Sequence, residues 1–318
     1  QGDPDLIWAV RNDGKLSTLT YKQKEDISGW ATHYIAGTHV NSNGVTVNNG
    51  KVISMCSLPR PNNNDRVWFC VERRINGQTM RSLEYLADKI EFVNRKDFFT
   101  FSDTDPKAAE EADESKFVNA VYEQQKEVTH MDMSLFYDGS SYGLAANATM
   151  TPGVIALGAT GTFTASANVF SSDMVNREIW KPYDELGVGG GRAKITGYIS
   201  PTQVSVEILV AFNNNETMPA GKWYLTTNIV KGLKPLEGQT VCILADGATR
   251  ADATVTNGRV TLENQQSKIR VGLKYIGRIR TLNIDAGGVS GPAASKSRSI
   301  VSIIANLFNT LGIRFGTT

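Results

Sequence analysis

Apolar and polar residues alternate along short runs through much of this 318-residue chain. The pattern is clearest in residues 154–227, where RAKITGYI and QVSVEILVAF each place branched apolar side chains on one parity. A period of two predicts strands with one buried face, and turn residues separate these runs at close intervals. We therefore predict that one domain, residues 129–229, is a small antiparallel β-barrel or sandwich.

The same alternation fills residues 1–96. LIWAV and LSTLTY flank an Asn-Asp-Gly turn at residues 12–14, and DRVWFCVERRI and QTMRSLEY flank Asn-Gly at residues 76–77. Both turns supply the positive φ angles of a tight hairpin, and GWATHYI and KVISMCSLPR each add a strand. Such units are typical of β-propeller blades. Only about two blades fit into these residues, which is too few to close a propeller. The chain also starts at Gln1. For both reasons we expect the chain to be the C-terminal part of a longer polypeptide.

Two further segments complete the predicted organisation. Residues 97–128 form an acidic linker with a short helix around residues 116–126, and a calcium site is rejected because the loop glycine and the final glutamate are missing. Residues 230–318 predict a β platform of four or five short strands, with hairpins at residues 246–247 and 257–258. The apolar spacing of residues 299–311 predicts a helix. An extended strand is the alternative for the first half of this run, because four β-branched residues lie between 300 and 304.

These patterns predict a mainly β fold: partial propeller-like blades, a small β-barrel or sandwich, and a C-terminal β platform with a short helix. The formal net charge of +1 gives the chain no overall attraction to nucleic acid or to membrane surfaces. We expect no membrane span, since no run of about 18 apolar residues is present, and no secretory signal pattern is found.

The three cysteines are too few for a zinc site or a disulfide framework. Cys56 and Cys70 lie on neighbouring predicted strands, where they could face each other. We expect a buried pair of free thiols, with a disulfide as the alternative. This cysteine usage suits a protein made in a reducing compartment.

Two features of the sequence could suggest catalysis, but neither has the full pattern. The GVGGGRA run at residues 187–193 lacks the lysine of a phosphate loop and precedes a strand-like run, so we interpret it as a turn. A hydrolase would need His33 or His39 as its base. Asp65 and Ser57 would complete that set, but no nucleophile elbow or HExxH pattern accompanies them. We therefore expect no catalytic residue, no cofactor, no metal and no enzyme activity.

Basic residues near the C-terminal end form the one marked charge asymmetry: Lys268, Arg270, Lys274, Arg278, Arg280, Lys296 and Arg298. In a strand, Lys268, Arg270 and Lys274 share a parity and line one face. We interpret this stripe as a solvated or subunit-facing surface. The alternatives are contact with phosphate, or ion pairs with the acidic linker of a neighbouring subunit, whose candidates are Glu110, Glu111 and Glu114.

Sugar binding is a further option, because aromatic rings can stack on sugars. The candidates are Trp30, Trp68, Trp180 and Trp223. Most tryptophans in strands belong to the core, so we expect core roles for most of them.

Several longer motifs carry a family resemblance. DLIWAVRNDGKLSTLTY with GWATH, then RRINGQTMRSLEYLAD, and finally GLKPLEGQTVCILADGA and VGLKYIGRIRTL occur in this order along the chain. They resemble, over nearly the whole length, the tail nozzle proteins of short-tailed bacteriophages, also called tail tubular protein B. FSSDMVNREIW is similar to a segment of the FCCH fold of ubiquitin-activating enzymes, except that Met174 is inserted and Asn176 stands where glycine is expected.

The resemblance implies a structural virion protein. Tail nozzle proteins form a homohexameric ring below the tail adaptor and extend the tube through which DNA leaves the capsid. The implied partners are further copies of the chain, the adaptor, tail fibre or spike proteins, and viral DNA that passes without sequence-specific binding. The implied location is the virion tail, after synthesis in the host cytoplasm. Two alternatives stay open: a phage carbohydrate- or receptor-binding β module, and a tail-associated hydrolase.

Overall fold

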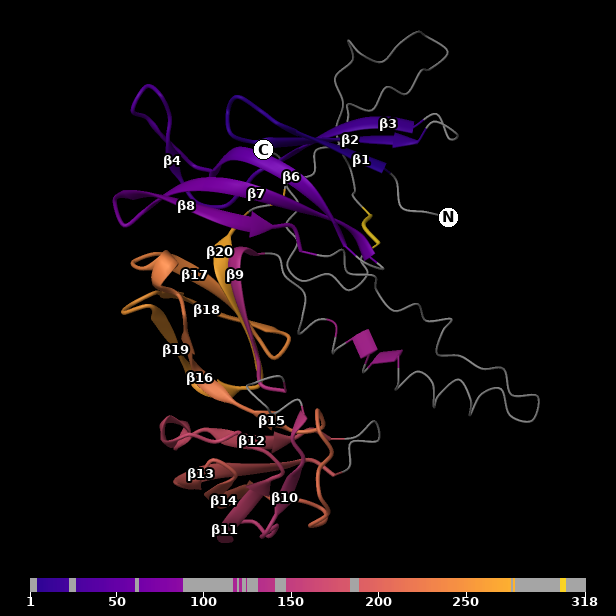
Figure 1. Cartoon of the computed structure of the whole chain (residues 1–318), viewed down its shortest axis with the longest axis vertical. Coiled ribbons are helices and arrows are strands. Elements are labelled where there is room, and N and C mark those ends of the chain that lie inside the picture. Colours follow the sequence, from indigo (N-terminus) through magenta and orange to yellow (C-terminus); the bar gives the residue numbers. More distant parts are fainter. Residues whose placement is uncertain are drawn as a thin grey trace, which may run out of the picture. The chain divides into compact units, whose positions relative to one another are not determined.

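The computed structural model describes residues 5–22, 27–60, 63–87, 117–118, 120–121, 124, 131–140, 147–183, 189–275, 277 and 304–306. The chain forms two compact units, Gln1–Tyr275 and Ile276–Thr318. All strands of the described residues lie in the first unit and pair antiparallel with their neighbours (Figure 1). The fold is therefore mainly β with several antiparallel sheets, as predicted.

The N-terminal part contributes three sheets. The first contains β1 (Asp5–Val10), β2 (Leu16–Lys22) and β3 (Ile27–His33). The second contains β6 (Lys51–Arg60), β7 (Asn63–Ile75) and β8 (Gln78–Tyr85). A short ribbon of β4 (His39–Val40) and β5 (Thr46–Val47) separates them in sequence. Both predicted hairpins are confirmed, since β1 pairs with β2 across residues 12–14 and β7 pairs with β8 across residues 76–77.

The β1–β3 and β6–β8 sheets pack face to face, and we call this pair the N-terminal sandwich. The rings of Trp8 on β1 and Phe69 on β7 have centroids 6.3 Å apart. Leu16, Phe69 and Val71 are buried in the cluster between the sheets. Each sheet has three strands in the described residues, whereas a propeller blade has four. The propeller-like description therefore stays a prediction.

The central sheet has six strands in the order β10-β11-β14-β13-β12-β15. They are β10 (Met150–Pro152), β11 (Thr160–Ala165), β12 (Glu178–Lys181), β13 (Gly191–Ser200), β14 (Gln203–Val210) and β15 (Tyr224–Leu225). All six contribute to one buried cluster, at whose centre Phe163, Ile195 and Trp223 are fully buried. Because every strand presents side chains to the same core, the sheet curls around that core.

A 3-10 turn, η4 (Ser172–Met174), leads into β12. Asn176 follows this turn with φ of 73°. Asparagine tolerates this left-handed conformation better than most residues other than glycine. Asn176 can therefore occupy the position where the resembling FCCH segment carries glycine.

The remaining strands form a module that we call the platform. It contains β9 (Met131–Asp138), β16 (Thr227–Lys231), β17 (Thr240–Ala245), β18 (Ala248–Thr254), β19 (Arg259–Gln266) and β20 (Lys268–Lys274). Four of them form a sheet in the order β18-β17-β20-β9, and β16 pairs with β19. A second 3-10 turn, η5 (Lys234–Leu236), follows β16. Val241, Ile269 and Val271 are fully buried in the platform core.

The predicted turns of the platform are confirmed. Asp246 and Gly247 have φ of 48° and 77°, and Asn257 and Gly258 have φ of 54° and 68°. The pairing of β9 with β20 crosses the boundary predicted between residues 229 and 230. The domain boundaries themselves stay predictions.

The two predicted helices are described only in part. Residues 117, 118, 120, 121 and 124 have helical backbone, inside the segment predicted to be helical. Of the C-terminal run at residues 299–311, only residues 304–306 are described, and they have no regular secondary structure. The choice between helix and strand for that run lies outside the described residues.

Gly139 joins the central sheet to the platform. Its N–H donates to the carbonyl of Ser267 at 2.8 Å, and its carbonyl accepts from the N–H of Leu225 at 3.2 Å. The hydroxyl of Tyr137 donates to the carbonyl of Leu225 at 2.5 Å. A side chain at position 139 has no room, because an added Cβ would collide with the carbonyl oxygens of Leu225 and Ser267.

Replacing Gly139 tests this joint. Gly139→Ala is expected to lower the free energy of unfolding by about 1–3 kcal/mol, because backbone must move to admit the methyl group. Urea unfolding measures the change. Gly29→Ala in β3 is the control: nothing lies within 4 Å of a Cβ there, so its effect should stay within about 0.5 kcal/mol. Equal stability of the two variants would contradict the tight joint.

Candidate functional site

The structure separates the basic residues predicted to form a stripe. Lys268 is buried at the start of β20. The guanidinium of Arg270 lies 4.4 Å from the ring centroid of Phe136, and the ammonium of Lys274 lies 3.7 Å from the carboxylate of Asp252. The three side chains do not form one open basic face, and their interface role stays a prediction. Other residues predicted for this surface lie outside the described residues: Arg278, Arg280, Lys296, Arg298, Glu110, Glu111 and Glu114.

Asp246, in the LADG segment, holds the start of β20. Its carboxylate accepts from the hydroxyl of Ser267 at 2.6 Å, from the N–H of Ser267 at 3.0 Å and from the N–H of Lys268 at 2.8 Å. A carboxylate that receives several hydrogen bonds fixes the chain locally. Asp246 therefore has an architectural role.

A buried charge cluster connects the N-terminal sandwich to the platform. Arg73 on β7 is 0% exposed. Its two terminal nitrogens donate to the carboxylate of Glu84 on β8, and its Nε donates to the carbonyl of Ala36 at 2.8 Å. One terminal nitrogen also lies 3.2 Å from the hydroxyl of Ser82 and 3.8 Å from the sulfur of Met133 on β9. All three guanidinium nitrogens have acceptors, as a buried charge requires.

Asp132 is the platform's carboxylate in this cluster. Its Oδ2 accepts from the N–H of Ala36 at 2.6 Å. Burial raises the pKa of Asp132, and the charge of Glu84 raises it further, whereas the hydrogen bond from Ala36 and the charge of Arg73 oppose the rise. The guanidinium of Arg73 is thus hydrogen-bonded to Glu84 and acts on Asp132 through its charge. The ionised form of Asp132 is disfavoured by its surroundings.

The cysteines are free but differ from the predicted buried pair. Cys56 pairs across the strands with Trp68, and Cys70 pairs with Ser54. The two cysteines are therefore diagonal neighbours on one face, and Cys56 is exposed, so the prediction of a buried pair is wrong. Diagonal neighbours lie about 7–8 Å apart, which is too far for a disulfide. Burial raises the pKa of Cys242, which disfavours its nucleophilic thiolate.

The histidines considered for a hydrolase have other partners. Nε2 of His33 lies 2.7 Å from the hydroxyl of Thr18, and burial lowers the pKa of His33. Nδ1 of His39 donates to the carbonyl of Asn49 at 2.7 Å. Neither contact involves Ser57 or Asp65, the other two residues of the hydrolase hypothesis. The two histidines therefore serve local packing in the N-terminal part.

The glycine-rich run is a turn that leads into a strand. Gly189 has φ of 84°, and β13 begins at Gly191. A phosphate loop would lead into a helix. Residues 189 and 190 therefore agree with the interpretation as a turn, and residues 187 and 188 lie outside the described residues.

The tryptophans differ in their surroundings. Trp223 is fully buried, and Trp180 donates its indole N–H to the carboxylate of Glu178 at 2.6 Å. Trp68 is half-buried on β7. Trp30, in contrast, is 67% exposed on β3. Of the four candidates for sugar stacking, Trp30 presents the most open ring.

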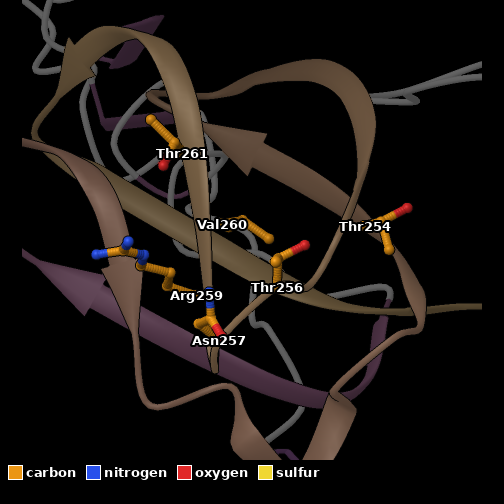
Figure 2. A pocket seen from close by; sticks show the side chains of 6 residues that line it. All are labelled: Thr254, Thr256, Asn257, Arg259, Val260 and Thr261. Carbon is orange, nitrogen blue, oxygen red and sulfur yellow. The ribbon is translucent and has the colours of Figure 1, made fainter. Parts of the chain in front are cut away.

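A hollow of about 310 Å³ lies at the turn between β18 and β19. It is lined by Thr254, Thr256, Asn257, Arg259, Val260 and Thr261. Figure 2 shows Arg259 and Thr254 extending away from each other. The polar groups do not converge on one point, and the hollow lacks the apolar lining typical of small-molecule sites.

No metal or membrane site is found in the described part of the chain. There, no three His, Cys, Asp or Glu side chains are placed together to hold a metal ion. None of the helical segments in those ranges is long and apolar enough to cross a membrane. No protein-family model matches the chain, and no curated protein matches it. The function therefore has to be inferred from the chain's own residues.

The Arg73 cluster is the feature that sequence reasoning missed. A signal existed, because strand alternation places Arg73 on the same parity as the buried residues Phe69, Val71 and Ile75. An arginine on a buried parity indicates a paired guanidinium inside the fold. Asp132 joins the cluster through the N–H of Ala36 and comes from a distant strand, so its place there follows only from tertiary structure.

Removing the buried guanidinium is expected to be costly. Arg73→Met should lower the free energy of unfolding by about 3–5 kcal/mol, because Glu84 would stay largely buried without its counter-charge. The control is Arg81→Met on β8, since Arg81 is exposed and pairs with Glu72 at 2.9 Å. That exposed pair contributes about 0–1 kcal/mol. Chemical denaturation of both variants distinguishes them, and similar losses would contradict the special role of the cluster.

Asp132→Asn is expected to raise the free energy of unfolding at neutral pH and to flatten its pH dependence. The folded state raises the pKa of Asp132 above its ordinary value of 3.8, so just above that pH the folded state binds more protons than the unfolded state. Protonated Asp132 therefore contributes to the free energy of unfolding. This contribution is complete below pH 3.8 and is lost as the pH rises through the pKa of Asp132 in the folded state. The amide removes the charge and keeps an acceptor for Ala36.

Unfolding of wild type and Asp132→Asn between about pH 4 and pH 8 measures this contribution. Asp132→Ala serves as the comparison, because it leaves the N–H of Ala36 without its acceptor and should lose about 1–3 kcal/mol. A lower stability of Asp132→Asn than of wild type at neutral pH would show that attraction to Arg73 outweighs the burial of the charge.

Proposed function

We propose that this chain is a structural subunit of a bacteriophage tail, forming part of the nozzle or tube through which DNA passes into the host. The motifs that resemble tail nozzle proteins support the proposal, because they cover nearly the whole chain in the order of that family. The proposed partners are further copies of the chain in a homohexamer, the tail adaptor, and tail fibre or spike proteins.

The observation that carries the proposal is what the motif residues do. In GLKPLEGQTVCILADGA, Leu233, Leu236 and Val241 are buried in the platform core. Asp246, at the end of the same motif, holds the start of β20 through its carboxylate. These motif residues thus stabilise the platform core and the start of β20, and this role suits a structural subunit better than a catalyst.

The electrostatics of β20 suit a conduit. DNA that moves through a lumen should not be held, because each phosphate that a protein neutralises adds salt-dependent affinity. On β20, Arg270 stacks on Phe136 and Lys274 lies near Asp252. Because these basic groups already have partners within the chain, their affinity for phosphate is reduced. The net charge of +1 agrees with this.

A phage receptor- or carbohydrate-binding module is the second candidate. One observation favours it: the exposed indole of Trp30 offers a flat surface on which a sugar ring can stack. Stacking alone gives little selectivity, because sugar recognition also needs polar groups that fix the hydroxyls.

Molar mass and shape in solution test the proposal. Light scattering of the purified chain should give a multiple of the 34.7 kDa subunit, and negative-stain images of the same peak should show rings with a central channel. A monomer that binds glycans on an array, and loses that binding in Trp30→Ala, would replace the conduit with the receptor-binding function.

A further inference from the structure

The outer face of the β6–β8 sheet is unusually apolar for a surface. Strand register places Cys56, Trp68 and Tyr85 in one row across the three strands, and Ser54, Cys70 and Leu83 in the next. Leu83 is 71% exposed and Tyr85 is 51% exposed. An antiparallel sheet with one free face normally shows polar residues there. We call this face the β6–β8 outer face, and its exposed apolar residues make it a candidate contact surface.

The second sheet of the sandwich has a matching surface. Ile7, Leu19 and Trp30 form one row across β1, β2 and β3, and Tyr21 lies two residues further along β2. Ile7 is 55% exposed and Trp30 is 67% exposed. We call this the β1–β3 outer face.

The two outer faces lie on opposite sides of one sandwich. The inner faces meet through Trp8, Leu16, Phe69 and Val71. Residues of the opposite parity therefore point away from that core on both sheets. Head-to-tail assembly needs two different contact surfaces on one subunit, because each interface then joins unlike surfaces.

The chemistry of the faces fits a second copy of this chain. The β6–β8 outer face combines aromatic rings with Arg66, whose guanidinium lies 4.4 Å from the ring centroid of Tyr85. Aromatic residues and arginine are enriched at protein interfaces. At its margin Arg81 and Glu72 pair at 2.9 Å, so the local charges cancel. The net charge of +1 also leaves little repulsion between copies.

We propose that the β6–β8 outer face of one copy binds the β1–β3 outer face of the next copy, head to tail. The inference rests on the proposed function, in which copies of the chain form a ring. It adds which surfaces join the copies.

Two charge substitutions and one control test it. Leu83→Asp and Trp30→Asp each damage one face, and each should weaken self-association by at least about 30-fold, the factor that corresponds to an interface hot spot. Leu157→Asp is the matched control. Leu157, in the turn before β11 of the central sheet, is 71% exposed like Leu83, and its replacement should leave assembly unchanged. Light scattering over a dilution series gives the affinities, and thermal unfolding checks the fold of each variant.

Mixing the two variants tests the head-to-tail geometry directly. Leu83→Asp chains keep an intact β1–β3 outer face, and Trp30→Asp chains keep an intact β6–β8 outer face. An equimolar mixture should therefore form a dimer with one intact interface and grow no further. Dimers of either variant alone would overturn the head-to-tail arrangement, because the one intact face would then be joining a copy of itself. A mixture that stays monomeric would also overturn the inference, because the two intact faces would then not bind each other.

The exposed thiol of Cys56 gives a readout without any substitution. Maleimide labelling of Cys56, followed by peptide mass spectrometry, should be slower in assembled wild type than in Leu83→Asp. Rings that persist in both face variants, with Cys56 labelled freely, would overturn this inference and leave the proposed function intact. A wild-type chain that stays monomeric would overturn the inference and would also count against the proposed conduit.

Discussion

A buried guanidinium imposes the strictest condition on this structure. Arg73 can stay inside only while its acceptors are in place. These come from the loop at Ala36, from Ser82 and Glu84 on β8, and from Met133 on β9. Leaving a charge buried without partners costs several kcal/mol. The cluster therefore couples the N-terminal sandwich to the platform more specifically than apolar contacts do, since apolar contacts tolerate small shifts in position.

Turn chemistry made much of the fold predictable. Asn76 and Asp246 adopt the positive φ that their Asn-Gly and Asp-Gly dipeptides favour, so the hairpins followed from sequence alone. Register was harder, because a small change in pairing decides which side chains meet. Alternation brought Cys56 and Cys70 to the same face, but it could not show that they are diagonal neighbours or that Cys56 is exposed.

The candidate surfaces, too, could be predicted from the sequence only in part. Sequence counting found the basic residues of β20, yet the surroundings of Arg270 and Lys274 depend on Phe136 and Asp252, which lie on other strands. Side chains that meet across a sheet are set by tertiary pairing, and local patterns carry little information about it. The apolar outer faces were harder still, because an exposed leucine and a buried one look alike until burial is known.

The pairing of β9 with β20 affects the order in which the chain can fold during synthesis. β9 ends at Asp138 and β20 begins at Lys268, and the whole central sheet lies between them. On the ribosome the central sheet emerges complete while the platform still lacks its last strands, and domains fold as they emerge. Until β20 leaves the exit tunnel, β9 lacks the strand with which it pairs and can pair with other nascent chains instead. Slow translation of residues 240–274 would therefore prolong the stage at which this protein is most prone to mispairing.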